Sequence, residues 1–336
     1  MANSESGEDL NAQGQGDYLA RTLRLRIAYM YYVERMTQSE IAAKLGIGRV
    51  TVVRHLNEAR RRREVRFWIE GALAESVALE QQLQNRFGLE RAVIAPNAGE
   101  SVNVTRLVGF RTGMFVSQLL RDGISLGVGW GRTLHRALET LSAQDVQDLG
   151  VVSLLGGIYH AREHNPSEFA WQVASILGAD CYLFTAPAVV DSVETKTALL
   201  ERCGLDTVVR KARNVDVALF GVGSMHPEAT TLRYGRGMLP RNIRTELLEA
   251  GAVGDICFHF FDRQGQLVDH PVNDRIMSVP VDMLHSVPQR VLAAGGREKL
   301  DALLAGMKLL KPTVLITEET TAQALLDRTH PETIES

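Results

Sequence analysis

The segment from Thr37 to Leu56 allows the backbone few arrangements, because it contains the start and stop signals of consecutive helices. It reads TQSEIAAKLGIGRVTVVRHL. Thr37 and Glu40 have the spacing of a capping box, in which the two residues satisfy each other's amides at a helix start. Gly46 suits the left-handed residue that ends a helix. The sequence therefore predicts a helix-turn-helix, whose second helix begins near Arg49.

The helix after the turn has two different sides. Val52, Leu56 and Ala59 repeat at helical spacing and predict a buried side. The other side is suited to the major groove of DNA, where arginine pairs with guanine and asparagine with adenine. A glutamine on the preceding helix and arginines at the helix end are suited to phosphates. An ordinary three-helix bundle is the alternative. The predicted DNA contacts are Gln38, Arg49, Val50, Thr51, Val53, Arg54, Asn57, Arg61 and Arg62.

Charge is distributed unevenly along the chain. Between Tyr18 and Ile69 there are 12 Lys and Arg residues and 4 Asp and Glu residues, a net charge of +8. The rest has 25 and 36, a net charge of −11. This segregation indicates a module for nucleic acid or another anionic surface, joined to a domain with a different function. Within the basic part, Val65 to Ile69 predicts a short strand that forms one side of a wing.

Length and composition limit the class of protein. A chain of 336 residues with 45% hydrophobic residues supports two or three domains with sizeable cores. Its apolar runs are too short to span a membrane, so we expect a soluble protein of the cytoplasm. The polar residues 1–17 predict a disordered tail. The widely spaced Cys181, Cys203 and Cys257 indicate buried thiols rather than disulfides or a zinc site.

A linker helix and then an α/β domain follow the basic module. Apolar spacing between Leu73 and Phe87 predicts a helix that either covers the next domain or pairs with its copy in a second subunit. Beyond Arg91, short apolar strands alternate with helical stretches such as Val104–Leu120 and Pro166–Leu177. This alternation is typical of a layered α/β domain with a mainly parallel sheet. The predicted strands are Ala92–Ala95, Ser125–Val128, Val151–Leu155, Cys181–Thr185, Val217–Gly221, Val291–Ala294 and Val314–Thr317.

Glycine-rich segments follow several of these strands, at the end of the sheet where ligands bind. Glycine lets backbone amides approach an anion, and Arg132 and Thr133 add groups suited to phosphate. Asp255 would accept hydrogen bonds from sugar hydroxyls, while Lys299 would neutralise a phosphate or form an imine. Tight turns, a turn cap and a surface salt bridge are the structural alternatives. The predicted ligand contacts are Gly129, Gly131, Arg132, Thr133, Gly156, Gly157, Gly223, Ser224, Asp255 and Lys299.

Other candidate sites are less convincing. His160 and His164 have the spacing of two metal ligands on a helix, but nearby glycine and proline place them in a loop, so no metal site is predicted. Ser224 lacks the flanking pattern of a nucleophile. The alternative function is a sugar-phosphate isomerase, deaminase or transferase that has acquired a DNA-binding domain, with Asp255 or Glu298 as general base. We expect no enzyme, no catalytic residues and no cofactor.

In their order, these segments resemble the SorC family of bacterial sugar-sensing transcriptional regulators. The DNA-binding signature of that family is similar to YYVERMTQSEIAAKLGIGRVTVVRHL. Landmarks of its effector domain are similar to LGVGWGRTL, LLGG, GVGS, GAVGDICFHFFD and AGGREKLDALL…VLITEETTAQALL. The resemblance covers Tyr18 to Leu326 and is nearest to regulators of polyol catabolism, including the erythritol repressor type. One departure is Thr317-Glu318-Glu319, where relatives commonly have Thr-Asp-Glu.

The resemblance implies an effector domain similar to sugar-phosphate isomerases and deaminases, retained as a sensor and assembled as a homodimer or homotetramer. It implies that a phosphate is held by Gly129, Gly131, Arg132 and Thr133, and that the sugar is contacted by Asp255 and Lys299.

We therefore expect four parts: a disordered tail (1–17), a winged helix-turn-helix domain (18–72), a linker helix (73–90) and a layered α/β effector-binding domain (91–330). The expected function is a DNA-binding transcriptional regulator, a repressor, of a carbohydrate or polyol catabolic operon. Its partners are operator DNA and a sugar, a polyol or one of their phosphates, without a membrane.

Overall fold

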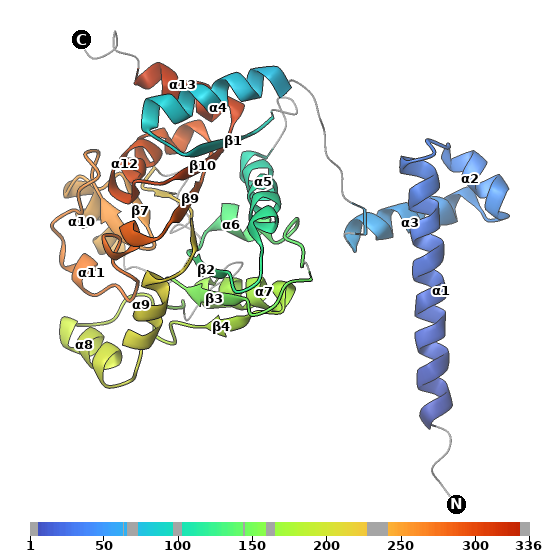
Figure 1. The fold of residues 1–336 in the computed structure, drawn as a ribbon, viewed down its shortest axis with the longest axis horizontal. Helices are drawn as coiled ribbons and strands as arrows, with labels where there is room; N and C mark the ends of the chain where they lie inside the picture. Colours follow the sequence, from blue (N-terminus) through green and yellow to red (C-terminus); the bar gives the residue numbers. More distant parts are fainter. Residues whose placement is uncertain are drawn as a thin grey trace, which may run out of the picture. The chain divides into compact units, whose positions relative to one another are not determined.

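The structure, a computed structural model, describes residues 6–62, 64–65, 73–96, 103–143, 145–158, 165–226 and 241–329. The chain divides into two compact units, Met1–Ile69 and Glu70–Ser336 (Figure 1). No helix in the described ranges is long and apolar enough to cross a membrane.

Three helices are described in the first unit: α1 (Ser6–Tyr32), α2 (Gln38–Leu45) and α3 (Arg49–Arg61). α1 begins within the segment for which the sequence predicted a disordered tail. The three helices share an apolar core that includes Ile27 of α1, Ile41 of α2, and Val52 and Leu56 of α3.

The helix signals read from the sequence are confirmed in this unit. The Glu40 amide donates to Thr37 Oγ1 at 3.3 Å, and the Thr37 amide donates to Glu40 Oε2 at 2.7 Å, which completes the capping box of α2. Gly46 ends α2 with a φ of +64°. α3 begins at Arg49 after Gly48, which has no side chain to cap the helix.

An ion pair connects the first helix of this unit to the segment after the third helix. Arg24 of α1 is buried and donates through its terminal nitrogen to Glu64 Oε1 at 2.6 Å. Because of this hydrogen bond, the pKa of the Glu64 carboxyl lies below its usual value. Residues 66–69 of the predicted wing strand lie outside the described ranges.

Seven strands make the central sheet of the second unit, in the order β1-β10-β9-β5-β2-β3-β4. Every neighbouring pair is parallel, so the predicted mixed α/β fold with a parallel sheet is confirmed. All seven strands were predicted to within a few residues. They are β1 (Arg91–Ala95), β2 (Ser125–Val128), β3 (Gly150–Ser153), β4 (Asp180–Tyr182), β5 (Val217–Phe220), β9 (Gln289–Ala293) and β10 (Val314–Glu318).

Helices cover both faces of this sheet (Figure 1). Alternate strand residues enter two separate apolar cores, so that Val151 belongs to one core and Val152 to the other. One core includes residues of α5 (Val104–Leu119) and α7 (Pro166–Leu177). The other includes residues of α4 (Leu73–Phe87), α9 (Asp206–Arg213), α12 (Leu300–Leu310) and α13 (Glu319–Arg328). The remaining α-helices described are α6 (Arg132–Ala137), α8 (Val193–Glu201), α10 (Arg241–Glu249) and α11 (Pro271–Asp274).

A small antiparallel sheet, which the sequence did not predict, lies in the same unit. Its strands, in spatial order, are β6 (Gly223–Ser224), β7 (Gly254–Ile256) and β8 (His259–Phe261). β7 and β8 are joined by two residues, Cys257 and Phe258, whose φ angles are +50° and +67°.

The two edges of the central sheet are β1 and β4. On β1, the Ile94 amide donates to Glu80 Oε1 of α4 at 2.9 Å. A side chain of the covering helix thus occupies a backbone donor of the edge strand.

Candidate functional site

A cavity lies at the carboxyl ends of β2 and β5, the end at which parallel sheets bind ligands. α6 begins just beyond β2, and a short 3-10 helix (Arg297–Lys299) follows β9. The lining residues are Trp130, Gly131, Arg132, Thr133, Gly221, Val222, Gly223, Asp255, Cys257 and Lys299. Six of the ten ligand contacts predicted from the sequence therefore meet here: Gly131, Arg132, Thr133, Gly223, Asp255 and Lys299.

Asp255 of β7 is a buried carboxyl, only 6% exposed. Burial raises its pKa to about 6, while the Phe258 amide, which donates to Oδ2 at 3.1 Å, and the charge of Lys299 act to lower it. Asp255 pairs with Gly223 across β6 and β7. A Cβ at position 223 would lie 1.9 Å from Asp255 Oδ1, so any other residue there would force this carboxylate to move.

Lys299 faces the same cavity and is also 6% exposed. Its Nζ donates to the Val222 carbonyl oxygen at 3.3 Å. Burial, followed by the nearby charge of Arg132, lowers its pKa to about 8, although the charges of Glu298 and Asp255 act to raise it. Near pH 7 the ammonium and the Asp255 carboxylate are both mainly charged.

These groups can bind an anion and hydroxyls together. Arg132 and Lys299 supply positive charge and N–H donors, and the buried Thr133 supplies a hydroxyl. Asp255 can accept hydrogen bonds from ligand hydroxyls. The cavity has the chemistry for a small, polyhydroxylated molecule with one anionic group.

Two of the other predicted contacts pack neighbouring elements instead of lining this cavity. The Gly129 amide donates to the Leu219 carbonyl oxygen at 2.8 Å, and a Cβ at position 129 would lie 2.9 Å from that oxygen. Ser224 Oγ donates to the Glu298 carbonyl oxygen at 3.2 Å. Gly129 thus brings β2 close to β5, and Ser224 connects β6 to the 3-10 helix.

Gly156 and Gly157 also lie outside the cavity lining and contact the segment after β4. The Gly157 amide donates to the Ala186 carbonyl oxygen at 2.8 Å. A Cβ on Gly156 would lie 2.5 Å from the same oxygen. These glycines allow the backbone after β3 to approach the backbone after β4 closely.

Four lining residues were missed by sequence reasoning: Trp130, Gly221, Val222 and Cys257. Trp130 could have been found, because it stands between two glycines of the predicted loop and is too large to be accommodated without a specific partner. Its ring stacks on Phe258, with centroids 5.2 Å apart and an interplanar angle of 6°. Val222 contributes its backbone carbonyl, which accepts from Lys299, and the identity of a side chain does not reveal such a contact.

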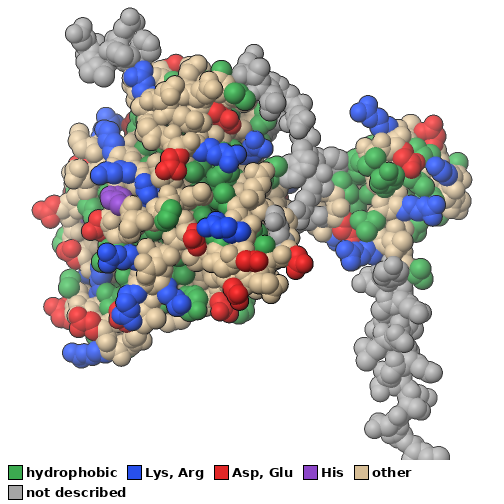
Figure 2. Space-filling view, viewed as in Figure 1, with side chains coloured by type: hydrophobic (Ala, Val, Ile, Leu, Met, Phe, Trp, Pro, Cys, Tyr) green, Lys and Arg blue, Asp and Glu red, His purple; other side chains and the backbone are tan. Residues whose placement is uncertain are grey.

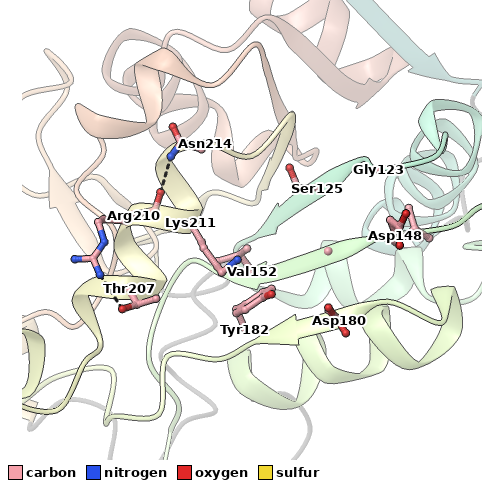
Figure 3. Close-up of a pocket in the computed structure, with 12 residues that line it drawn as sticks. Gly123, Ser125, Asp148, Val152, Asp180, Tyr182, Thr207, Arg210, Lys211 and Asn214 are labelled. Carbon is pink, nitrogen blue, oxygen red and sulfur yellow. Dashed lines mark hydrogen bonds between the residues drawn. The ribbon is translucent and has the colours of Figure 1, made fainter.

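A larger cavity, of about 500 Å³, lies at the opposite, amino ends of β2, β3 and β4 (Figure 3). Asp148 and Asp180 lie on one side of it, and Arg210 of α9 on the other. Lys211 Nζ sits 3.9 Å from the centroid of the Tyr182 ring. Arg210 is paired with an aspartate of its own helix. Because this cavity contains none of the predicted contacts and lies at the less usual end of the sheet, we place the candidate site in the smaller cavity.

The predicted DNA contacts lie mainly on the exposed side of α3. Val50 is 83% exposed, and Arg49, Arg54 and Asn57 are exposed as well. Arg49 Nε donates to Gln38 Oε1 at 3.4 Å, which brings together predicted contacts from α2 and α3. Lys and Arg side chains protrude from this unit (Figure 2).

The two arginines at the end of α3 are engaged by an acidic neighbour. Arg61 and Arg62 both pair with Glu58, Arg62 through Nε at 2.6 Å from Oε1. The Arg62 hydrogen bond is the main reason why the pKa of Glu58 is lowered. A phosphate at this end of the helix would compete with that carboxylate.

Comparison with known proteins matches most of the chain to one group. Residues 72–327 match the family model Sugar-bind, a sugar-binding domain. The chain is 30% identical over 313 residues to the uncharacterized transcriptional regulator YjhU of Escherichia coli (strain K12), with 90% of this chain and 93% of that protein covered. It is also 30% identical over 308 residues to the erythritol catabolism regulatory protein EryD of Brucella abortus (strain 2308), covering 91% and 96%.

A solved structure agrees with this. The full-length sorbitol operon regulator SorC from Klebsiella pneumoniae superposes with a TM-score of 0.72 at 28% identity. The match covers 91% of this chain and 98% of that chain.

Proposed function

This chain belongs to the Sugar-bind family, whose members related to it are transcriptional regulators of the SorC type, and we propose that it represses a carbohydrate or polyol catabolic operon. A sugar, a polyol or one of their phosphates binds the second unit and weakens operator binding by the first. This requires a ligand with different affinities for two conformations of the protein. A regulator of this kind acts on the chromosome, in the cytoplasm.

The observation that carries the proposal is the meeting of Arg132, Lys299 and Asp255 in one cavity at the carboxyl ends of the sheet. The two cations and Thr133 bind the phosphate of the effector, and Asp255 binds its hydroxyls. Gly223 leaves room for the Asp255 carboxylate, and Gly131 adopts the positive φ angle, +127°, at the start of α6. This division predicts that a phosphorylated polyol binds more tightly than the free polyol.

We further propose that α2 and α3 form the helix-turn-helix, with α3 as the helix that enters the major groove. Its exposed face has the arginine and asparagine side chains that read guanine and adenine. The same chain thus combines a DNA-binding face with a ligand cavity, as a ligand-controlled regulator requires.

A homodimer is the assembly that we propose, because one helix-turn-helix contacts only one half-site. α1 offers a surface for it. Leu25 and Tyr29 of α1, and Val33 just after its end, repeat every four residues and are 39%, 57% and 61% exposed. Pairing of two such stripes would bury all three side chains.

An isomerase or deaminase with an added DNA-binding domain remains the second candidate. One observation favours it: the pKa of Asp255, about 6, suits a general base near neutral pH. Glu298, the other base named from the sequence, is not among the lining residues. Steady product formation from a panel of sugar phosphates would favour this second candidate.

The test uses the full-length protein and labelled DNA from upstream of its own gene and of the genes beside it. We expect fluorescence anisotropy to show binding to one fragment, and one class of sugar or polyol phosphate to reduce it. Lys299→Met should keep the DNA affinity and lose the response, whereas Lys308→Met, which removes an exposed lysine of α12, should keep both. Binding that no metabolite changes would overturn the proposal.

A further inference from the structure

The turn between β7 and β8 adopts a backbone conformation that its residues disfavour. Both Cys257 and Phe258 have positive φ angles, and a two-residue hairpin of this kind is normally built from asparagine and glycine. A side chain with a Cβ is strained in this region. Such a turn persists only when its surroundings hold it in place.

Three contacts hold this turn in place. The Phe258 ring is fully buried and stacks on Trp130, nearly parallel at 5.2 Å. The Phe258 amide donates to Asp255 Oδ2 at 3.1 Å. The Cys257 thiol is buried against Gly129, where an added Cβ would lie 3.2 Å from Sγ.

These contacts join the two walls of the cavity. Trp130 belongs to the loop that continues into Arg132 and Thr133, whereas Asp255 belongs to the hairpin. The stack holds the Phe258 backbone, and the Phe258 amide in turn holds one oxygen of the carboxylate. If the turn relaxed, this amide would leave Asp255, and the carboxylate would lose its fixed orientation.

We propose that Phe258 is a positioning residue of the effector site: its stack on Trp130 keeps the strained turn in place and thereby fixes the Asp255 carboxylate toward the ligand. The inference rests on the proposed function for its ligand, but the geometry concerns the protein alone. The positive φ angle and the hydrogen bond to Asp255 belong to the Phe258 backbone, so the side chain acts on the carboxylate only by holding the turn.

The test is a pH titration of Asp255 in the full-length protein. The ¹³C NMR signal of its side-chain carboxyl reports the titration, and the Asp255→Asn variant identifies which signal belongs to this residue. Two titratable groups lie near this carboxyl, Lys299 and the Cys257 thiol, and the charge of Arg132 acts on Lys299. Since the Phe258 amide favours the charged form, Phe258→Leu should raise the titration midpoint above about 6, by half a pH unit or more.

A second substitution separates positioning from packing. Adding Cys257→Gly to Phe258→Leu should return the midpoint toward the original value, because glycine accepts positive φ without strain. If Phe258→Leu does not fold, Trp130→Leu removes the same stack from the other ring. A midpoint that neither Phe258→Leu nor Trp130→Leu changes would overturn the proposal.

Binding of inorganic phosphate tests the other wall of the cavity, which contains Arg132. Its affinity, measured by calorimetry, should change less than twofold in Phe258→Leu, because the anion contacts Arg132 and Lys299. A loss of phosphate affinity as large as that in Lys299→Met would mean general collapse of the cavity and would overturn the positioning role. If the unmodified protein binds no phosphate or sugar phosphate while the midpoint moves as expected, the proposed function fails and the positioning role stands.

Discussion

At the scale of single residues, the buried carboxylate of Asp255 depends on the absence of a side chain at position 223. Gly223→Ala places a Cβ against Asp255 Oδ1. We expect the free energy of unfolding to fall by about 1–3 kcal/mol, the usual cost of overpacking, and the ligand response to be lost. Urea denaturation measures the stability, with Gly150→Ala as control, since its Cβ would lie 3.9 Å from the nearest atom. Equal costs for both variants would contradict this role of Gly223.

The same carboxyl makes stability depend on pH. Its pKa is raised to about 6 in the folded protein, so between about pH 4 and 6 the folded state binds more protons than the unfolded state. The free energy of unfolding should therefore decrease as the pH rises through this window and level off above it. Relative to Asp255→Asn, the wild type should lose up to about 3 kcal/mol. Unfolding curves of both proteins between pH 4 and 7 test this, and a constant difference would contradict it.

At the scale of elements, helix boundaries and strands of the central sheet could be read from the sequence because their causes are local. The capping box and Gly46 act within a few residues, and each strand is a short apolar run. The small sheet was missed because β6, β7 and β8 have only two or three residues. Its turn also lacks the Asn-Gly pair that is typical of a two-residue hairpin.

The local cap of α2 can be tested directly. Thr37→Ala removes the hydroxyl that accepts the Glu40 amide, and we expect the first unit to lose about 1 kcal/mol of stability. Ser39→Ala, which changes an exposed residue two positions after Thr37, should alter stability by less than about 0.5 kcal/mol. Thermal unfolding followed by circular dichroism distinguishes the two. Equal stability of both variants would show that the cap contributes nothing.

The exposed face and the carboxyl end of α3 should behave differently toward DNA. Arg54→Ala removes a side chain from the exposed face, so we expect discrimination between operator and scrambled DNA to fall about tenfold or more. Arg61→Gln should weaken binding to both DNAs alike and reduce the salt slope by about one. Anisotropy titrations at several salt concentrations measure both quantities. The assigned reading face is wrong if the two variants have the same effect.

At the scale of the whole molecule, the strand order decided which predicted contacts meet. β2, β5 and β9 are neighbours, so the segments after them bring Arg132, Gly223 and Lys299 together. β3 lies one position further out, and its glycines turn toward the segment after β4. Sequence identifies which strand ends carry polar or small residues, but the order of strands depends on long-range pairing that no local pattern specifies.

The exposed stripe on α1 leads to a prediction about assembly. If Leu25, Tyr29 and Val33 pair between two subunits, Tyr29→Glu would bury a charge and should shift the protein toward smaller species. Operator affinity should fall with it, because two half-sites are then no longer bound together. Sedimentation velocity measures the mass, and Tyr29→Phe is the conservative control. Unchanged mass in Tyr29→Glu would remove this stripe from the interface.

The hydrogen bond from Ile94 to Glu80 also bears on how copies of this protein can associate. An outermost strand with a free donor invites an extended peptide to extend the sheet, which is a common start of aggregation. Here that donor is already occupied from within the chain, and the opposite border is only three residues long. Copies of the protein can therefore come close together while the borders of this sheet offer little template for fibre growth.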